Sequence, residues 1–182
     1  FLLLCSFLFC LGTASAQQKF SVASPDGKLK LVLDIAPEKV AYSVKYGKQL
    51  LLEDSRLGFE FDSGEFGAGL KAGKVQRRKI DEAYELVVGK VRRARNHCNE
   101  MTVPLVERNG KERTVNLVVR AFDDGIAFRY EFPEQDGWDS YVMYDERTQF
   151  NLKENPMALV MYLPGYVNTH EGPYSHVRYD KV

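Results

Sequence analysis

The sequence predicts an all-β fold, an antiparallel β-sandwich, and three observations carry this prediction. Apolar and polar residues alternate along several segments, turn-forming residues separate these segments, and no apolar stripe of helical period is sustained. Alternation with a period of two places the apolar side chains on one face of a strand and the polar ones on the other. Strands at such close spacing favour two packed antiparallel sheets over units in which strands alternate with helices.

Five segments show this alternation most clearly. We expect strands over 28–35, 40–46, 57–62, 115–121 and 126–132. The apolar residues that should share a core-facing side in these strands are Leu29, Leu31, Leu33, Ile35, Val40, Tyr42, Val44, Tyr46, Leu57, Phe59, Phe61, Val115, Leu117, Val119, Ala121, Ile126, Phe128, Tyr130 and Phe132.

Turn-forming residues lie between the alternating segments. These turns are Pro25-Asp26-Gly27, Tyr46-Gly47-Lys48, Asn109-Gly110 and Asp123-Asp124-Gly125. Asn-Gly and Asp-Gly favour tight hairpins because they tolerate positive φ angles. The glycine-rich stretch 64–73 has no period, so we expect a loop or an irregular crossing between sheets. It is not expected to hold a phosphate, because it lacks the glycine spacing of a phosphate-binding loop and no helix follows it.

Length and charge limit the classes of protein. The chain has 182 residues with 25 basic and 25 acidic side chains, which suits a single domain with a sizeable core. A net charge of zero gives no long-range field for a polyanion, so we expect no nucleic-acid partner. Two basic clusters, 76–79 and 90–95, could bind a polyanion. Because Asp81, Glu82 and Glu85 lie close by and can balance the charge, a solvated strand face or loop is the favoured interpretation.

The first sixteen residues predict a partial signal peptide. An apolar run over 1–11 is too short to span a bilayer, and Ala14 and Ala16 form the small-residue motif of a cleavage site. Because the chain starts at Phe1, without Met or a basic segment, we expect a fragment at its front end. We therefore expect the mature domain to cover 17–182 and to be exported to the periplasm, with no membrane span.

Two other locations remain as alternatives, an outer-membrane lipoprotein and an extracellular protein. Cys10 follows an apolar run, as a lipidated cysteine does, but the residue before such a cysteine is normally small and here it is Phe9. Without the first sixteen residues only Cys98 remains, so no disulfide can form within the chain. Cys98 is expected to be a small buried apolar residue.

The residues alone suggest no catalytic group. The sequence has neither the nucleophile motif of the α/β-hydrolases nor the His-Glu-x-x-His motif of zinc proteases. Acidic pairs such as Asp123-Asp124 sit in turns, where aspartate is favoured by its bonds to the backbone. The stretch 163–174, which contains His170 and Glu171, is rich in Pro, Gly and aromatic residues. A binding loop on a rigid scaffold and an ordinary surface linker fit this composition equally well.

Five motifs, taken together and in order, suggest a family. They are Ser24-Pro25-Asp26-Gly27-Lys28-Leu29, Ser55-Arg56-Leu57-Gly58-Phe59-Glu60, the stretch from Arg95 to Val103, the stretch from Arg120 to Pro133, and Glu146-x-Thr148-x-Phe150-Asn151-Leu152. In this order the sequence resembles the N-terminal domain of glycoside hydrolase family 97, the family of Bacteroides-type α-glucosidases and α-galactosidases. The resemblance covers essentially the whole mature chain, and the segment from Arg120 is its most specific part.

The resemblance implies a particular sandwich and a particular enzyme. The N-terminal domain of the family is a β-sandwich of the galactose-mutarotase-like (supersandwich) kind, and it packs against a (β/α) barrel that carries the catalytic carboxylates. Such a barrel needs roughly 250 residues, so we expect it to be absent from this chain and the chain alone to be inactive. The expected partners are an oligosaccharide with α-glucosidic or α-galactosidic bonds and the C-terminal barrel of the same polypeptide.

The resemblance also implies a metal site. Family members of the α-glucosidase type hold calcium at the active site, and the N-terminal domain contributes one glutamate from a loop. Glu171 is the residue that matches this ligand. A single carboxylate is one of the six to eight oxygens that calcium requires, so the barrel would supply the others.

The alternative hypothesis for the function of the chain is a non-catalytic β-sandwich module that binds a glycan or docks a partner domain.

Overall fold

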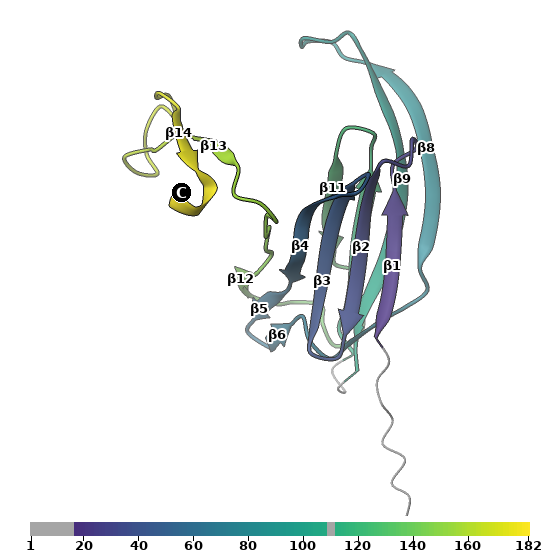
Figure 1. Cartoon of the computed structure of the whole chain (residues 1–182). Helices are drawn as coiled ribbons and strands as arrows, with labels where there is room; N and C mark the ends of the chain where they lie inside the picture. Colours follow the sequence, from purple (N-terminus) through teal and green to yellow (C-terminus); the bar gives the residue numbers. More distant parts are fainter. Residues whose placement is uncertain (1–16, 109–111) are drawn as a thin grey trace, which may run out of the picture.

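The computed structural model of the protein describes residues 17–108 and 112–182, and in these residues it is built almost wholly of strands (Figure 1). The predicted signal peptide, residues 1–16, and the predicted turn at Asn109-Gly110 lie outside the described residues. The helical content of the described part is a short 3₁₀ turn, η1 (Tyr179–Lys181). No helix in the described part is long and apolar enough to cross a membrane.

The strands form two main antiparallel sheets. The first sheet has the order β1-β2-β3-β4, and the second has the order β11-β10-β9-β7, with β8 also paired to the long strand β9. The bounds of these strands are β1 (Gln18–Ala23), β2 (Leu29–Ala36), β3 (Lys39–Tyr46), β4 (Gln49–Leu57), β7 (Leu70–Ala72), β8 (Gln76–Glu85), β9 (Arg93–Glu107), β10 (Thr114–Ala121) and β11 (Ile126–Glu131).

Two smaller sheets complete the fold. A three-stranded sheet has the order β12-β5-β6, and β13 and β14 form a separate hairpin near the C-terminus. Their bounds are β5 (Phe59–Phe61), β6 (Gly64–Phe66), β12 (Met143–Glu146), β13 (Met157–Val160) and β14 (Ser175–Arg178). Every recorded pair of strands is antiparallel. The prediction of an all-β antiparallel sandwich is therefore confirmed.

The core lies between the two main sheets and follows the predicted alternation. Leu31, Leu33 and Ile35 on β2 are no more than 1% exposed, and Val115 and Val119 on β10 are fully covered. Burial of a large aliphatic side chain contributes about 1.5–3 kcal/mol, so these alternating positions contribute strongly to the stability of the fold. The remaining members of the core cluster that the alternation predicted are Leu29, Val40, Tyr42, Val44, Leu57, Phe59, Phe61, Leu117 and Ala121.

Two sequence predictions need correction. Tyr46 was expected to face the core, but it ends β3 beside the turn at Gly47, where nothing covers it, and it is 45% exposed. The glycine-rich stretch 64–73 was expected to lack regular structure, yet it contains the short strands β6 and β7. The connection between them is irregular as predicted. Gly67 has a φ of 153°, and a Cβ there would lie 3.0 Å from the carbonyl oxygen of Leu57.

The turn between β1 and β2 is held by side chains as well as by its glycine. Gly27 has a φ of 76°, and its N–H donates to the carbonyl oxygen of Ser24 at 2.9 Å. Asp26 accepts hydrogen bonds from the Ser24 hydroxyl and the Lys28 N–H, and these bonds lower the pKa of Asp26 to about 2. The Asp26 N–H donates to Asp123 Oδ1 at 2.9 Å. This contact joins two of the predicted turns, which lie far apart in the sequence.

A buried arginine ties the small sheet to the β9–β10 connection. Arg113 is 3% exposed, and its guanidinium donates to both carboxylate oxygens of Glu107 at 2.6 and 2.7 Å. It also donates to the Ser63 hydroxyl and to the carbonyl oxygens of Gly64 and Glu65. The five N–H groups of the fork are thus all used. The aromatic rings that surround the guanidinium belong to Phe61, Phe66 and Trp138.

Candidate functional site

The candidate site lies on an arm, residues 147–182, that leaves the sandwich at the edge of β4. Residues 147–153 run along this edge, where Gln149 N donates to the carbonyl oxygen of Arg56 at 2.9 Å and Lys153 N donates to that of Leu51 at 3.0 Å. Leu52 and Leu152 form an isolated antiparallel bridge. The segment therefore satisfies the edge of the first sheet before the chain moves away from it.

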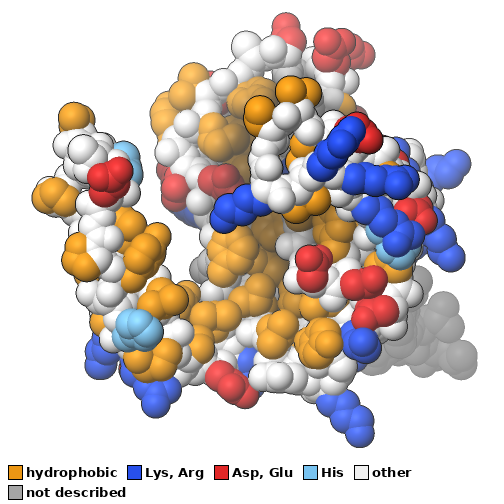
Figure 2. Space-filling view, turned by 90° about the horizontal axis from the view of Figure 1, so that it is seen from above, with side chains coloured by type: hydrophobic (Ala, Val, Ile, Leu, Met, Phe, Trp, Pro, Cys, Tyr) orange, Lys and Arg blue, Asp and Glu red, His pale blue; other side chains and the backbone are white. Residues whose placement is uncertain are grey.

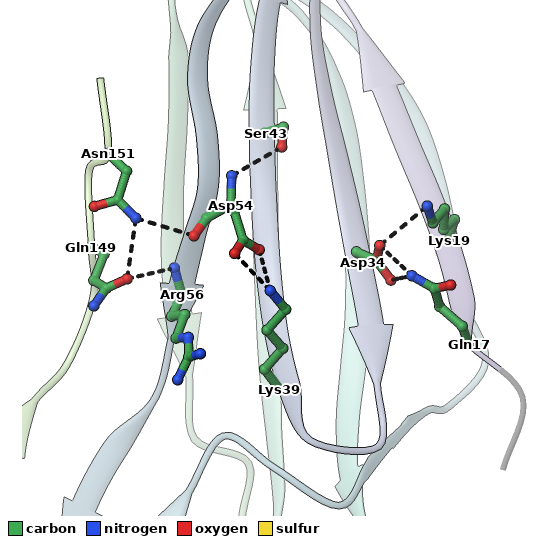
Figure 3. Close-up of polar contacts among 9 residues, drawn as sticks. All are labelled: Gln17, Lys19, Asp34, Lys39, Ser43, Asp54, Arg56, Gln149 and Asn151. Atoms are coloured by element: carbon green, nitrogen blue, oxygen red, sulfur yellow. Dashed lines mark hydrogen bonds and ion pairs between the residues drawn. The ribbon is translucent and has the colours of Figure 1, made fainter. Parts of the chain in front are cut away.

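Side chains reinforce this junction. Asn151 Nδ2 donates to the carbonyl oxygen of Asp54 at 3.1 Å, and Gln149 Oε1 accepts from the backbone N–H of Arg56 at 3.3 Å (Figure 3). Asp54 has a φ of 45°, in the stretch where the register between β3 and β4 shifts. Lys39 donates to its carboxylate at 2.6 Å. The bulged strand is thus fixed on both sides, so the base of the arm is the well-anchored part of it.

Beyond residue 153 the arm becomes a two-stranded hairpin. In its register Leu159 lies opposite His176 and Met157 opposite Arg178. Arg178 also donates to the carbonyl oxygen of Asn155 at 2.9 Å, which closes the base of the hairpin. In Figure 1 this hairpin stands clear of the sandwich at the upper left. A two-stranded hairpin is marginally stable in water by itself, so the pairing of β13 with β14 contributes little stability of its own.

The hairpin and its loop are covered with exposed apolar side chains. Tyr166 and Val167 are fully exposed, and Leu159 is 63% exposed. Others that remain more than one third exposed are Met157, Tyr162, Leu163, Tyr174, Tyr179 and Val182. Large exposed apolar patches on a soluble protein are typical of interaction sites.

An apolar groove of about 460 Å³ lies between the base of the arm and the open end of the sandwich. Phe150 and Tyr179 line it from the arm, and Tyr42, Leu52 and Phe128 line it from the two sheets. Figure 2 shows hydrophobic side chains on the arm and across the hollow beside it. Burial raises the pKa of the Tyr42 hydroxyl. Phe150 and Tyr179 thus belong both to the arm and to the lining of the groove.

Glu171 follows a constrained turn in the loop between β13 and β14. The Asn168 side chain accepts from the His170 N–H at 2.6 Å and donates to the carbonyl oxygen of Gly165. His170 has a φ of 53°, the left-handed conformation that few residues other than glycine adopt. Glu171 itself is exposed. The turn therefore presents the Glu171 carboxylate on the outside of the loop.

The residues around Glu171 suit a shared calcium site but not a complete one. A carboxylate is a hard oxygen ligand of the kind that calcium prefers. Within residues 17–108 and 112–182, no group of three or more His, Cys, Asp or Glu side chains lies close enough to hold a metal ion. Glu171 could thus contribute to a calcium site only as one ligand among others from outside this arm.

The first basic cluster is built into the second sheet by ion pairs. Glu100 is 6% exposed and accepts from Arg78 at 2.5 Å and from Arg120 at 2.7 Å. The Arg78 guanidinium, followed by that of Arg120, lowers the pKa of the Glu100 carboxyl despite its burial. Next to them Cys98 is 1% exposed, and burial raises the pKa of its thiol. The interpretation of Cys98 as a small buried residue is confirmed. In the first basic cluster Arg78 is balanced by Glu100, whereas the expected acids Asp81 and Glu85 pair with Arg95 and Arg92 of the second cluster.

A polar hollow of about 400 Å³ lies on the outer face of the same sheet. Its lining includes Arg78 and Arg129 as well as the uncharged side chains of Gln76, Thr102 and Asn116. These three uncharged side chains have no hydrogen-bond partner among the described residues. Sequence reasoning missed this hollow, because its residues come from four strands and form no motif.

The fold and the arm define a class of protein: a β-sandwich domain that carries an exposed apolar arm. The family is more specific. The chain matches the family described as "Glycosyl-hydrolase 97 N-terminal" over residues 22–182, and it belongs to this family.

Two relatives have named activities. The chain is 30% identical over 131 residues to a retaining α-galactosidase from Bacteroides thetaiotaomicron, a match that covers 71% of this chain and 18% of that protein. It is 32% identical over 135 residues to a probable retaining α-galactosidase from Streptomyces bingchenggensis, covering 71% of this chain and 21% of that one. The chain therefore spans about a fifth of these relatives.

Solved structures agree on the fold. A glycoside hydrolase family 97 enzyme from Pseudoalteromonas in complex with panose matches with a TM-score of 0.79 and 28% identity, covering 86% of this chain and 24% of that one. A β-arabinopyranosidase matches with a TM-score of 0.73 and 30% identity, covering 87% of this chain and 26% of that one. The predicted family and its sandwich fold are therefore confirmed.

Proposed function

We propose that this chain is the N-terminal, barrel-supporting domain of an exported glycoside hydrolase that acts on α-glucosidic or α-galactosidic bonds. The observation that carries the proposal is the apolar arm, in a chain of this family that spans about a fifth of its curated relatives. In this proposal residues 17–182 form the domain, and a catalytic barrel of the same polypeptide covers the arm.

The arm has the properties of an interface between parts of one protein. Residues 155–182 contain two acidic and two basic side chains, so the surface has no net charge that would direct it to a charged partner. Its exposed residues are mainly Tyr, Leu, Val and Met. Permanent interfaces are apolar and resemble a domain core. The groove beside Phe150 and Tyr179 extends the same surface onto the sandwich.

The names of the relatives support the substrate class. One is named a retaining α-galactosidase and one a probable retaining α-galactosidase, and a solved relative is in complex with panose, an oligosaccharide of α-linked glucose. Hydrolysis of such bonds uses two carboxylic acids on either side of the glycosidic bond. In the proposed enzyme both belong to the barrel, so no residue of this chain is assigned a catalytic role.

Glu171 is the residue through which the domain would reach the active site. The Asn168–His170 turn holds the backbone before it, and the carboxylate is free to face a neighbouring domain. Calcium bound there would stabilise negative charge and orient substrate hydroxyl groups. In this proposal, the role of the chain at the active site is to place one anionic oxygen ligand, from Glu171, beside the barrel.

The proposed export rests on the sequence of the first sixteen residues. The apolar run and the Ala14-x-Ala16 motif support a cleaved signal peptide and a periplasmic location. N-terminal sequencing tests this when the protein is produced in a bacterial host with a start Met and a basic segment placed before Phe1. Cleavage after Ala16 is expected, and retention of residues 1–16 in the cytoplasm would contradict export.

The test of the proposed function compares the domain alone with the domain joined to the rest of its reading frame. The domain alone should not hydrolyse p-nitrophenyl α-glucoside or α-galactoside, whereas the joined protein should hydrolyse at least one. In the joined protein, Glu171→Gln should lower both the bound calcium, measured by elemental analysis, and the sensitivity to a chelator.

Glu154→Gln is the matched control, because Glu154 is an exposed carboxylate on the same arm. It should leave bound calcium unchanged. Equal calcium content in the two variants would refute the role of Glu171. Activity of the domain alone would refute the assignment of catalysis to a barrel.

A second function is favoured by the polar hollow on the outer face of the second sheet. The free side chains of Gln76, Thr102 and Asn116 could bind the hydroxyl groups of a glycan, as expected of a non-catalytic binding module. Titration of the domain with galactose and maltose, followed by NMR of side-chain amides, tests this. Shifts confined to Gln76 and Asn116 would support glycan binding, and no shift at millimolar sugar would exclude it.

A further inference from the structure

We infer that the tip of the β8–β9 hairpin, residues 84–95, binds the surface of an anionic phospholipid membrane. This inference is independent of the proposed glycosidase function. The tip contains the second basic cluster, residues 90–95, and neither the core of the sandwich nor the proposed site uses this cluster.

The hairpin extends well beyond the sandwich. Ten antiparallel pairs join β8 to β9, from Gln76 opposite Thr102 to Glu85 opposite Arg93. Of the ten residues of β8, Ile80 is the buried one and the others are exposed. In Figure 1 the two strands rise past the ends of the other strands at the top. The tip is therefore held at a distance from the body by a regular ribbon.

The tip itself is apolar and open to solvent. Val87 is fully exposed, Val88 is 84% exposed and Val91 is 57% exposed, while Leu86 is 40% exposed. A single bond from the Leu86 N–H to the carbonyl oxygen of Arg92, 2.8 Å long, closes the loop. β-Branched side chains have few rotamers, so these valines lose little entropy when they enter another phase.

Basic side chains surround the apolar tip. Residues 84–95 contain four basic side chains and one acidic one, Glu85. Arg95 is paired with Asp81 at 2.7 Å, and Arg92 lies 3.8 Å from Glu85 with both side chains largely exposed. Lys90 and Arg93 form no ion pair with another described residue. An apolar tip beside unpaired cations matches a membrane interface, in which acyl chains lie beneath anionic headgroups.

The tip and the C-terminal arm differ in their charge. The arm is equally exposed but has balanced charges, whereas Lys90 and Arg93 at the tip have no ion-pair partner among the described residues. Each Lys or Arg beside an anionic bilayer contributes on the order of 1 kcal/mol. The whole chain is neutral, so this attraction is local and acts only within about a Debye length, ~10 Å at 0.1 M salt.

The experiment measures binding to vesicles with protein that starts at Gln17, so that the apolar segment 1–16 does not contribute. This protein retains every residue of the described core. It should cosediment with vesicles of equal parts phosphatidylcholine and phosphatidylglycerol, and not with pure phosphatidylcholine. Raising the salt should weaken the binding. Lys90→Gln with Arg93→Gln should reduce the partition coefficient about 30-fold, from two lost charges.

Two further double variants separate the tip from the arm. Val87→Asp with Val88→Asp should abolish binding to anionic vesicles, whereas Tyr166→Asp with Val167→Asp, at equally exposed positions of the arm, should leave it unchanged. Near-ultraviolet circular dichroism checks that all variants fold. The inference is overturned if wild type does not bind, if the arm variant alone loses binding, or if the tip variants change only the oligomeric state without vesicles.

Discussion

The sandwich and the C-terminal arm are made from similar residues but use them in opposite ways. On β2 the alternating side chains Leu31 and Leu33 are covered by the facing sheet, whereas Met157 and Leu159 on β13 alternate in the same manner and remain exposed. The same pattern thus produces a core in one region and an open surface in the other. Alternation determines which side chains share a face, and a second layer determines whether that face is buried.

Loss of the buried ion pair of Arg113 should lower the free energy of unfolding far more than loss of an exposed ion pair, and we expect this difference to be the largest of those tested. Arg113→Met leaves Glu107, 11% exposed, without its partner and removes five hydrogen bonds. We expect a loss of about 3–5 kcal/mol in the free energy of unfolding, measured with urea. Arg129→Met, in the exposed pair with Glu131, should cost no more than about 1 kcal/mol. Similar losses would show that burial of the Arg113 pair is unimportant.

Truncation of one leucine in each region tests the comparison most simply. Leu33 is fully buried and Leu159 is 63% exposed. Leu33→Ala should lower the free energy of unfolding by about 2–5 kcal/mol, because it removes buried contacts and leaves a cavity. Leu159→Ala in the domain alone should change it by no more than about 0.5 kcal/mol. A large loss for Leu159→Ala would mean that the arm packs on the sandwich.

Acid should weaken the sandwich through Glu100. The arginines hold the folded-state pKa of this carboxyl below its ordinary value of 4.5, so the unfolded chain binds a proton more readily. The stabilisation is therefore complete above about pH 4.5 and is lost as the pH falls through the lower folded-state pKa. Glu100→Gln should flatten the dependence of urea stability on pH below 4.5. An unchanged slope would show that other carboxyl groups control the acid response.

The sequence predicted the sandwich well because its strands have one buried face. The alternation at 29–35 and 115–121 identified much of the core. The prediction that Tyr46 faces the core failed because Tyr46 lies at the end of its strand, where the second sheet does not cover it. The buried position of Arg113 could not be predicted, since its partners at 63–65 lie about 50 residues earlier in the sequence and only the fold brings them to it.

The candidate site was predicted less completely. The stretch 163–174 was identified from its composition, and the structure shows that it is a hairpin loop with a constrained turn before Glu171. The exposed surface of the arm could have been suspected from the apolar residues at 157–167. Residue types do not reveal what covers such a surface, because packing between distant segments decides it. The role of Glu171 as a calcium ligand stays a prediction.

Amide hydrogen exchange along the arm tests most directly whether another domain covers it. The amides of β13 and β14 should exchange fast in the domain alone, because the hairpin has no second layer, and those of β2 should exchange slowly. In the protein joined to the rest of its reading frame, β13 and β14 should be slowed at least about 100-fold while β2 is unchanged. Equal exchange of β13 and β14 in the two proteins would contradict the proposal that the arm is a domain interface.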